Sequence, residues 1–366
     1  MKITVLYLGK SGGGCVYTYE MARLLLLRGM KIQLILSSFI ENKRDFEKLS
    51  QENLSLIYIP TYKSTRDFVL KSLGIFRFVK LGRQINSFSP EWIYIPMLSL
   101  WGRMILPFVN KKIKIVTTIH DVSMHLGEKN TMIDRFNDYI IKHSHKIITL
   151  SERFIPLIME KYSFRKEQIC WIRHGNYNYY RPDNFYKKNS ITKKILFFGR
   201  LHEYKGISVL LDAMPIVKEK DSDIVLNIVG NGIISNSDNE KIKKLGSSCN
   251  VKNKYIPNEE IYKYFEDVDF VVVPYIEASQ SGVLMLAYAF GKPVIATDIG
   301  GLPEQVFEDT GIIIQPNDRI ALANSILEMY ENPSKIFEMG KAAELKNDTL
   351  FSWKVSANTL LNFLSR

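Results

Sequence analysis

The sequence predicts an α/β protein built as two halves, each with a parallel β-sheet covered by helices on both faces. Short apolar runs of strand length alternate with longer helical patterns along the whole chain. Such alternation is the pattern that places helices on both faces of a parallel sheet. The chain also has 366 residues, more than one hydrophobic core usually organises, so two domains are expected.

The first half opens with a βαβ unit. A strand at Ile3–Leu8 leads through a glycine-rich turn, Gly9–Gly14, into a helix at Tyr17–Arg28, and a strand follows at Lys31–Ser37. Further strands are predicted at Leu56–Ile59, Trp92–Ile95, Ile113–Ile119 and Lys146–Leu150. This series predicts one α/β domain for residues 1–180.

A connector rich in Tyr and Asn, Gly175–Asn189, separates this series from a second one. Its predicted strands are Ile195–Phe198, Ile224–Val229, Val251–Ile256, Phe270–Val273, Pro293–Ala296 and Gly311–Ile314, with helices such as Ile207–Lys218 and Ala321–Tyr330 between them. This series predicts a second α/β domain for residues 181–350. The remaining residues, 351–366, contain an amphipathic stretch with no strand after it, and we expect a closing helix that packs back on the N-terminal domain.

Composition limits the classes of protein to which the chain can belong. Its three cysteines, Cys15, Cys170 and Cys249, are widely spaced and lack a metal-ligand pattern, which favours a reducing compartment. The apolar opening Met1–Leu8 is too short for a signal-peptide core, and later apolar runs are interrupted by charge well before about 18 residues. We therefore expect a cytoplasmic protein. The net charge of +11 implies attraction to nucleic acid, an anionic bilayer or phosphorylated ligands, with a solvated basic surface as the alternative.

An arginine and a lysine follow the first strand of the second half. Arg200, next to Gly199, and Lys205 lie beyond the carboxyl end of Ile195–Phe198, the edge at which open α/β sheets bind ligands. An arginine offers a planar fork for phosphate oxygens and a lysine a compact charge, so the pair suits a diphosphate. On its own, this stretch would favour a pair of surface cations.

A second segment of the same half is typical of an anion site. Gln280, Ser281 and Gly282 open an apolar helix at Val283–Phe290. A helix N-terminus has unpaired amides and a partial positive charge, which attract anions. We expect Arg200, Lys205 and this helix start to converge on one anion.

The first half offers two candidate positions at the same kind of edge. Ser11 and the glycines Gly12–Gly14 let the backbone approach a ligand, although a tight turn alone would also explain them. His120 follows the strand Ile113–Ile119, where a neutral-pH hydrogen-bonding group at a cleft rim suits sugar chemistry. The alternative for His120 is a structural hydrogen bond.

Two Asp-x-Asp patterns, Asp221–Asp223 and Asp267–Asp269, raise the question of a metal-bound ligand. We discount both, because Asp269 directly precedes a buried strand, Asp221–Asp223 occupies a turn, and such short patterns occur by chance. No metal and no cofactor are predicted.

The segment Ser64–Phe88 combines cations with apolar residues at helical spacing. The cations are Arg66, Lys71, Arg77, Lys80 and Arg83, and the apolar residues are Phe68, Leu73, Ile75, Phe76, Phe78 and Val79. Such a helix can lie in the interface of an anionic membrane. A helix packed on its own sheet with solvated cations is the equal alternative.

Several motifs together resemble glycosyltransferase family 4, whose members are retaining enzymes with the GT-B fold of two facing Rossmann-like domains and a C-terminal crossing helix. The motifs are Gly12–Gly14, His120, Gly199-Arg200, Lys205-Gly206, Val229-Gly230-Asn231-Gly232, Gly291-Lys292-Pro293-Val294 and Gly300-Gly301-Leu302-Pro303-Glu304. The resemblance implies that the second domain holds a nucleotide-diphosphate sugar, usually without a metal, and that the first holds the acceptor, here a glycan or lipid-linked sugar.

The resemblance also implies roles for individual residues. Arg200 and Lys205 resemble the diphosphate clamp, with the amides of Ser281 and Gly282 as its complement. The residues that resemble the rest of the donor site are Gly13, Gly14, Gly199, Gly230, Asn231, Tyr255, Ile256, Glu277 and Gln280, where Tyr255-Ile256 matches the stretch whose backbone meets the nucleobase. Gly12–Gly14 and His120 would border the sugar and the acceptor.

One departure from the family concerns a pair of glutamates that commonly precedes the Gly-Lys-Pro-Val turn. Here those places hold Ala278 and Leu286, and Glu277 lies one residue earlier than the first. We expect Glu277 and Gln280 to contact the donor sugar instead, because they are the long side chains of this loop that can accept hydrogen bonds from hydroxyls.

Other functions fit the same fold. A sugar-nucleotide epimerase would release a free epimerised sugar, and a non-catalytic sugar-nucleotide-binding subunit would leave the donor intact. Nucleic-acid binding is disfavoured, because the basic residues lack interleaved aromatics for base stacking.

Overall fold

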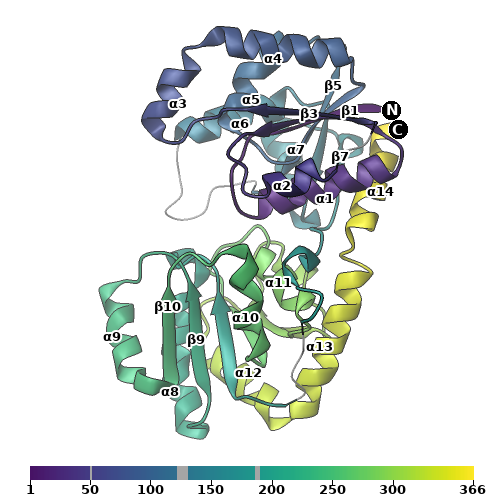
Figure 1. The fold of residues 1–366 in the computed structure, drawn as a ribbon. Helices are drawn as coiled ribbons and strands as arrows, with labels where there is room; N and C mark the ends of the chain where they lie inside the picture. The colour runs from purple at the N-terminus through teal and green to yellow at the C-terminus, as the bar shows by residue number, and fades with distance from the viewer. Residues whose placement is uncertain (50–51, 122–130, 186–189) are drawn as a thin grey trace. The chain divides into compact units, whose positions relative to one another are not determined.

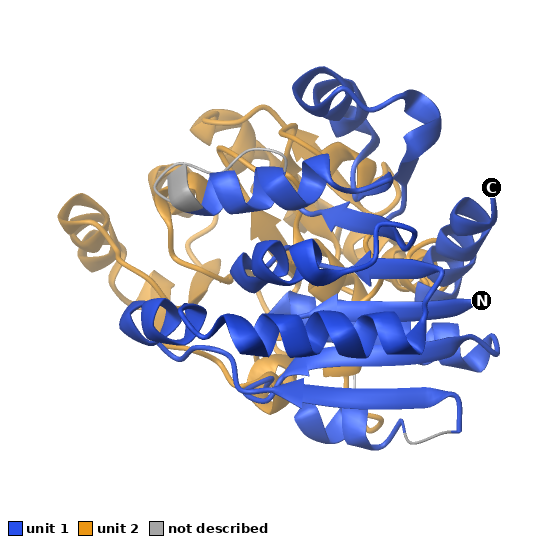
Figure 2. Ribbon diagram, turned by 90° about the horizontal axis from the view of Figure 1, so that it is seen from above, with its two compact units in different colours: residues 1–122, 130–173, 353–366 blue, residues 123–129, 174–352 orange. Residues whose placement is uncertain are grey.

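The computed structural model describes residues 1–49, 52–121, 131–185 and 190–366, and these form two compact units. Unit 1 joins the N-terminal part of the chain, as far as Arg173, to the last segment, Trp353–Arg366 (Figure 2). Unit 2 is formed by His174–Ser352. The end of the connector predicted at Gly175–Asn189 lies outside the described residues.

The described residues of unit 1 form a seven-stranded parallel sheet in the order β3-β2-β1-β4-β5-β6-β7 (Figure 1). Its strands are β1 (Lys2–Tyr7), β2 (Lys31–Ser37), β3 (Leu54–Ile59), β4 (Trp92–Ile95), β5 (Lys114–Ile119), β6 (Lys146–Thr149) and β7 (Ile169–Trp171). Its helices are α1 (Gly13–Leu27), α2 (Lys43–Glu47), α3 (Thr65–Ser72), α4 (Ile75–Phe88), α5 (Leu100–Ile105), α6 (Thr131–Lys142), α7 (Ile155–Tyr162) and α14 (Trp353–Ser365).

Both faces of this sheet are buried. Successive apolar residues of its central strand point to opposite sides, and helices cover each side. In β1, Val5 packs into a core with α1 and α14, whereas Leu6 packs into a second core with α4 and α5. The near-continuous apolar runs read from the sequence are therefore strands covered on two sides.

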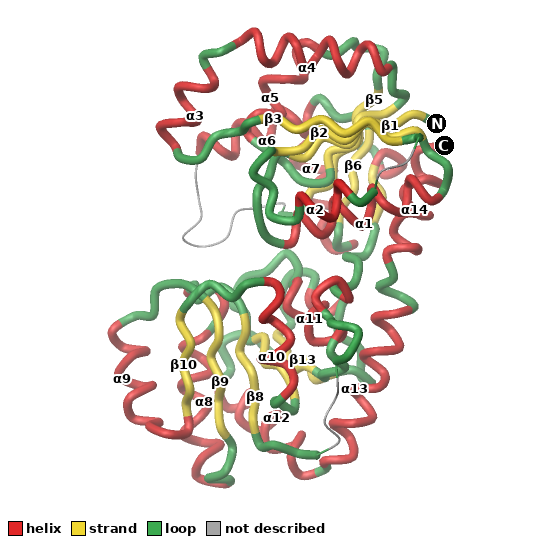
Figure 3. Tube along the Cα trace, viewed as in Figure 1, coloured by secondary structure: helices red, strands yellow, loops and turns green. Residues whose placement is uncertain are grey.

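Unit 2 repeats the architecture with a six-stranded parallel sheet in the order β10-β9-β8-β11-β12-β13 (Figure 3). Its strands are β8 (Lys194–Phe198), β9 (Val225–Gly230), β10 (Cys249–Asn253), β11 (Phe270–Val273), β12 (Val294–Thr297) and β13 (Gly311–Ile314). Its helices are α8 (Ile207–Lys220), α9 (Asn236–Leu245), α10 (Ile261–Glu266), α11 (Gly282–Ala289), α12 (Arg319–Glu331) and α13 (Pro333–Asp348).

The strand order reverses its direction at one place in each sheet. In unit 1 the first strand, β1, lies between β2 and β4, and in unit 2 the first strand, β8, lies between β9 and β11. The loops that follow the two neighbouring strands then lead away in opposite directions, which leaves a crevice at the carboxyl ends where doubly wound sheets bind ligands. Each unit therefore has one favoured position for a site.

The C-terminal helix belongs to unit 1 although it follows unit 2 in the sequence. The α14 helix packs against α1, and the Trp353 ring meets the Tyr17 ring edge-on with centroids 5.1 Å apart. The Ser356 hydroxyl donates to the carbonyl of Arg173 at 3.2 Å, and Lys146 Nζ donates to the carbonyl of Phe363. The amphipathic pattern of the tail thus corresponds to a helix with one face in the core of unit 1.

Two strand expectations were wrong in detail. The strand predicted at Val251–Ile256 ends at Asn253, so Tyr255 and Ile256 lie in the loop after β10. The short strand β7 was not foreseen. Among the described residues, none of the helices is both long enough and apolar enough to span a bilayer.

Candidate functional site

The loops after β8 and β11 touch at the switch point of unit 2, which is the place where the strand order of its sheet reverses. The amide of Ile276 donates to the carbonyl of Tyr204 at 2.8 Å. Gly206 adopts a φ of +71°, and a Cβ at this position would lie 1.8 Å from the carbonyl oxygen of Pro274. Only glycine fits both the left-handed backbone and the close approach. The Lys205-Gly206 pair found in the sequence therefore joins a candidate ligand residue to the glycine that lets the two loops meet.

Arg200, Lys205 and the start of α11 gather around the ring of Tyr275. Lys205 Nζ lies 3.7 Å from the centroid of that ring, and the Ser281 hydroxyl donates to the Tyr275 hydroxyl at 3.2 Å. Arg200 Nη2 donates to the Tyr204 hydroxyl at 2.9 Å. We call Arg200, Tyr204, Lys205, Tyr275 and Ser281 the Tyr275 cluster. The two cations and the helix start, which the sequence predicted to converge, are linked through two buried tyrosines.

The Tyr275 hydroxyl stays protonated at neutral pH. Burial raises the pKa of Tyr275 to about 12, although the hydrogen bond from Ser281 and the charge of Arg200 both act to lower that pKa. Because the hydroxyl accepts from Ser281, its own proton remains for donation. The cluster therefore combines cations with neutral hydrogen-bond donors, an arrangement that is suited to binding an anion.

The first turn of α11 offers a different amide from the one expected. The Ser281 amide donates to Gln305 Oε1 at 2.8 Å, and Gln305 Nε2 donates back to the carbonyl of Ser281 at 3.2 Å. The amides that open the helix toward a ligand are therefore those of Gly282 and the residues after it. Val283 lies beside the β8 loop, since a Cβ at Gly199 would be 3.4 Å from Val283 Cγ2.

The loop between β11 and α11 contains a buried acceptor without a donor. Gln280 Oε1 is buried and has no hydrogen-bond partner among the described residues. Leaving such an atom unpaired destabilises a fold, so it calls for an explanation. Glu277, in the same loop, is partly exposed, and its amide donates to the Tyr204 carbonyl at 3.4 Å. Glu277 is therefore tied to the Tyr275 cluster through its backbone, and Gln280 directly precedes Ser281 of that cluster in the sequence.

The remaining donor residues predicted in unit 2 follow β9 and β10. Leu201 donates its amide to the carbonyl of Asn231 at 3.0 Å, which ties the loop after Gly230 to the loop after β8. Tyr255 has 60% of its surface exposed, whereas Ile256 is buried. All of these positions lie on the carboxyl side of the sheet, the same side as the Tyr275 cluster.

In unit 1 the predicted glycines form the start of α1. A Cβ at Gly14 would lie 2.7 Å from both the Tyr7 hydroxyl and Met97 Sδ, so a larger residue there would require these side chains to shift. Gly13 is the first residue of the helix. The amide of Gly12 donates to Glu41 Oε1 at 2.8 Å, a carboxylate that the sequence did not single out.

His120 directly follows β5 and is held by the loop after β4. Its Nε2 lies 2.8 Å from the carbonyl oxygen of Pro96, and its ring meets the Tyr17 ring edge-on with centroids 5.1 Å apart. A carbonyl only accepts, so Nε2 bears the hydrogen, and Nδ1 of the neutral ring is an acceptor. Burial lowers the pKa of His120 despite the opposing effects of Pro96 and Asp121, so the neutral ring predominates at neutral pH.

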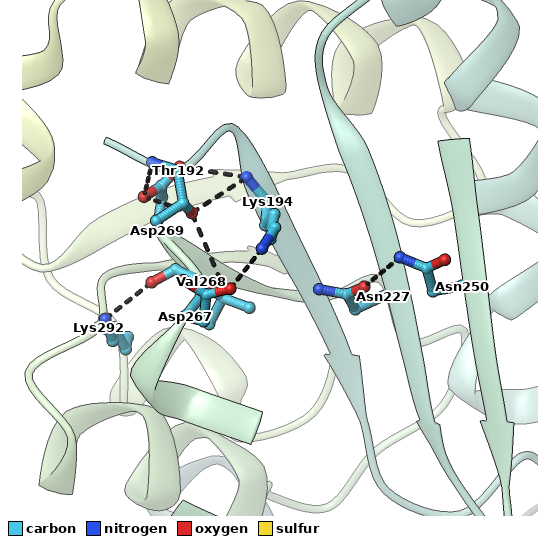
Figure 4. Close-up of polar contacts among 8 residues, drawn as sticks. All are labelled: Thr192, Lys194, Asn227, Asn250, Asp267, Val268, Asp269 and Lys292. Atoms are coloured by element: carbon cyan, nitrogen blue, oxygen red, sulfur yellow. Dashed lines mark hydrogen bonds and ion pairs between the residues drawn. The ribbon is translucent and has the colours of Figure 1, made fainter. Parts of the chain in front are cut away.

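The two Asp-x-Asp patterns have structural partners. Asp269 accepts from the Thr192 amide at 2.9 Å at the amino end of β11 (Figure 4). It also accepts from the Tyr330 hydroxyl at 3.0 Å. Asp267 pairs with Lys194, and Asp221 pairs with Lys193. These carboxylates lie at the edge of the sheet opposite to the Tyr275 cluster. No group of three or more potential metal ligands was found in the described part of the chain.

Comparison with known proteins places this architecture. Residues 11–175 match the family model described as Glycosyltransferase Family 4, and residues 192–332 match the model described as Glycosyl transferases group 1. The chain belongs to glycosyltransferase family 4. The predicted GT-B fold is confirmed, with its two Rossmann-like sheets and its C-terminal helix. Family membership does not depend on Ala278 and Leu286, whose departure from the paired glutamates stays a prediction from sequence.

This chain is similar to several individual glycosyltransferases. A D-inositol 3-phosphate glycosyltransferase of Corynebacterium aurimucosum is 31% identical over a segment that covers 47% of this chain and 42% of that protein. The amylovoran biosynthesis glycosyltransferase AmsK of Erwinia amylovora is 27% identical, over 47% and 44% of the two chains. The chain thus matches less than half the length of these curated relatives.

A solved structure extends the likeness over the whole chain. The Anabaena protein Alr3699/HepE in complex with UDP-glucose is 18% identical, covers 100% of both chains and has a TM-score of 0.71. At this identity the likeness shows the fold. The sequence analysis did not identify Tyr204, Tyr275 and Gln305 as site residues. None of the three lies in a recognisable motif, and their contacts form only when loops distant in the sequence come together.

Proposed function

We propose that this protein is a retaining glycosyltransferase that moves a sugar from a nucleotide-diphosphate sugar to a glycan or lipid-linked acceptor. Its setting in this proposal is the assembly of a surface polysaccharide or glycolipid at the inner face of the cell membrane. The Tyr275 cluster carries the proposal, because it gathers two cations and a helix start at the switch point of unit 2. Family membership supports it, as do relatives named for glycosyl transfer.

The donor diphosphate binds at the Tyr275 cluster in this proposal. Arg200 and Lys205 contact the phosphate oxygens, and the Gly282 amide adds a donor on the helix axis. Charge accumulates on the diphosphate as the bond to the sugar breaks. Fixed donors aimed at that charge lower the barrier by several kcal/mol where water is excluded. Tyr204 and Tyr275 act as positioning residues that hold the two cations.

The nucleoside and the sugar extend from this point along neighbouring loops. The backbones of Gly199, Gly230 and Asn231, and the stretch Tyr255-Ile256, accommodate the nucleotide by resemblance to the family. Glu277 and Gln280 contact the hydroxyls of the donor sugar. The unpaired Gln280 Oε1 supports this assignment, because a sugar hydroxyl is a donor that would satisfy it.

Unit 1 supplies the acceptor side. A Cβ at Gly12 would meet no atom within 4 Å, so the backbone just before α1 leaves room for a ligand. His120 offers Nδ1 as an acceptor for a hydroxyl. In this proposal His120 orients a hydroxyl of the acceptor or the sugar. Because the ring is neutral, it can take part without adding positive charge.

The reaction follows the family pattern of retention. The acceptor oxygen forms a bond to the anomeric carbon on the face from which the diphosphate leaves, and the bond between that carbon and the phosphate oxygen breaks. The acceptor proton passes to the departing phosphate. No covalent intermediate with the enzyme forms, so the residues of this chain bind, orient and stabilise charge.

A divalent metal has no assigned part in this scheme, because Asp221, Asp267 and Asp269 are engaged elsewhere. We expect EDTA to leave transfer activity largely intact. Complete loss of activity that manganese restores would contradict this assignment of the carboxylates.

A thermal-shift screen against sugar nucleotides tests the proposal directly. A donor at about 100 times its Kd stabilises the protein by about 2.7 kcal/mol, which raises the Tm. Arg200→Ala should abolish the shift, whereas Lys243→Ala, which removes an exposed cation of α9, should keep it. Absence of a shift with every sugar nucleotide would overturn the donor assignment.

Incubation of a stabilising donor with the protein then separates catalysis from binding. We expect release of the nucleoside diphosphate, by transfer or by slow hydrolysis. A donor that binds but stays intact would indicate a non-catalytic sugar-nucleotide-binding subunit. A free epimerised sugar would indicate an epimerase.

A further inference from the structure

Exposed apolar side chains gather where α3 meets α4. They are Val69, Leu70, Leu73, Ile75 and Phe76, which we call the elbow. The largest exposures are 69% for Leu70, 76% for Leu73 and 84% for Phe76. Consecutive large apolar residues with this much exposure are unusual on a protein surface unless something covers them.

The structure corrects the single surface-lying helix that the sequence predicted for Ser64–Phe88. The chain forms two helices with a break at Leu73-Gly74, which Figure 3 draws as a loop between α3 and α4. Phe68 and Phe78 belong to the core of unit 1 rather than to an exposed face. The apolar surface is therefore concentrated at the elbow and is not spread along a helix.

The elbow is held in place by the core beneath it. The Trp101 indole donates to the Ser72 hydroxyl at 3.0 Å, and the Trp101 ring meets the Phe78 ring edge-on with centroids 5.2 Å apart. The Ser64 hydroxyl caps α3 by accepting from the Asp67 amide at 3.2 Å. These contacts fix both helices, so the exposure of Leu70, Leu73 and Phe76 is a feature of the folded unit.

Cations precede and follow the elbow in the sequence. Between residues 63 and 83 the chain has six Lys or Arg and one Asp. Asp67 is paired with Lys71 at 2.9 Å, and the Arg77 guanidinium lies over the Trp101 ring. The exposed cations of this stretch are Lys63, Arg66, Lys80 and Arg83. Positive charge therefore flanks an apolar tip, with the single carboxylate already paired.

We propose that the elbow docks unit 1 on an anionic lipid bilayer. The apolar side chains enter the interface between headgroups and acyl chains, and Lys63, Arg66, Lys80 and Arg83 contact the anionic headgroups. A second copy of this chain is a poor occupant, because pairing two elbows would bring like charges together. This inference does not depend on the proposed glycosyl transfer, since it uses no residue of the donor site.

Co-sedimentation with vesicles tests the proposal without any assay of activity. We expect binding to vesicles of phosphatidylcholine with phosphatidylglycerol, at least roughly tenfold stronger than binding to phosphatidylcholine alone, and weakened by added salt. Equal recovery with both kinds of vesicle would overturn the choice of an anionic bilayer.

Variants at the elbow and matched variants in unit 2 locate the contact. Leu70→Ser with Leu73→Ser and Phe76→Ser should abolish binding, whereas Ile233→Ser, at a residue with 91% exposure in unit 2, should not change it. Arg66→Glu with Lys80→Glu should abolish binding, whereas Lys243→Glu with Lys244→Glu, the same change of charge in unit 2, should largely retain it. Circular dichroism confirms that each variant is folded.

Sedimentation velocity addresses the other occupant. We expect the parent and the serine variant of the elbow to have the same oligomeric state without lipid. A dimer that the serine substitutions dissociate would mean that a second copy covers the elbow. Unchanged vesicle binding by the serine variant would likewise overturn the proposal.

Discussion

Unit 2 and unit 1 use the same strand order to present different chemistry at the same edge of the sheet. In unit 2 the loops at the switch point are tied to one another by Tyr275, Gln305 and the close approach at Gly206. In unit 1 the corresponding edge has a helix start without a side-chain cap, a Gly12 amide that donates to Glu41, and a histidine held by the Pro96 carbonyl and the Tyr17 ring. A tightly tied edge suits a ligand part that does not vary, such as a diphosphate.

The largest effect should come from the cations of unit 2. We expect Arg200→Ala and Lys205→Ala each to lower kcat by at least roughly tenfold, because each removes a charge that faces the leaving diphosphate. Lys243→Ala should leave kcat unchanged. Steady-state kinetics with a fixed donor measures this, and full turnover in both cluster variants would remove the Tyr275 cluster from the mechanism.

The loop before α11 should give the next largest effect. We expect Glu277→Ala and Gln280→Ala each to lower kcat/KM for the donor by about 1–3 kcal/mol in transition-state terms, because each loses a hydrogen bond to a sugar hydroxyl. Gln280→Glu keeps an acceptor oxygen and should lose less. If both alanine variants keep full activity, the sugar is held by other residues.

A smaller effect is expected in unit 1. His120→Asn should lower kcat/KM for the acceptor by roughly five- to tenfold, the equivalent of one hydrogen bond, and should leave the thermal shift by donor unchanged. A loss of donor binding in this variant would contradict the proposal that unit 2 binds the donor and unit 1 the acceptor.

The pH dependence of the same residue is a separate check. Burial lowers the pKa of His120 below its ordinary value of 6.5, so the neutral ring persists until the pH falls through that lower value. We expect transfer activity to fall only as the pH drops through this lowered pKa. The pH–activity profile of His120→Asn should lack this fall. The sign for stability is the same, because a lowered pKa in the folded state means that unfolding binds a proton and becomes easier as the pH falls.

No gain in turnover is expected from a glutamate at Leu286. Leu286 is buried in α11, so Leu286→Glu places a carboxylate in an apolar setting and should not raise turnover. A gain in turnover would mean that the donor is bound as in family members with the paired glutamates, and that Glu277 has been assigned wrongly.

Local patterns in the sequence predicted the strands well, because a strand buried on both faces is an uninterrupted apolar run bounded by polar residues. Lys31–Ser37, Trp92–Ile95, Phe270–Val273 and Gly311–Ile314 have the predicted bounds. The three-residue strand β7 is too short for such a signal. The strand expected to reach Ile256 ends at Asn253, since apolar character alone does not mark where pairing with β9 stops.

The candidate site was predictable where one segment carries the chemistry. Arg200 and Lys205 could be placed from their position after β8. Tyr275 and Gln305 could not, because their importance comes from contacts between loops that are distant in the sequence. The sequence named Leu73, Ile75 and Phe76 of the elbow as apolar residues of a segment that can lie on a membrane. It did not separate them from the buried Phe68 and Phe78, because deciding which face of Ser64–Phe88 is buried requires the position of Trp101.

The return of α14 to unit 1 constrains how the chain can be made. Residues of α14, among them Trp353, Leu360 and Phe363, complete a core whose members outside α14 lie in the first half of the sequence. A ribosome releases the N-terminal segment first, and domains usually fold in that order. Here the whole of unit 2 emerges before α14 does. Unit 2 is therefore the first unit that can fold to completion during synthesis. The apolar surface of α1 that α14 covers stays exposed until α14 has been synthesised.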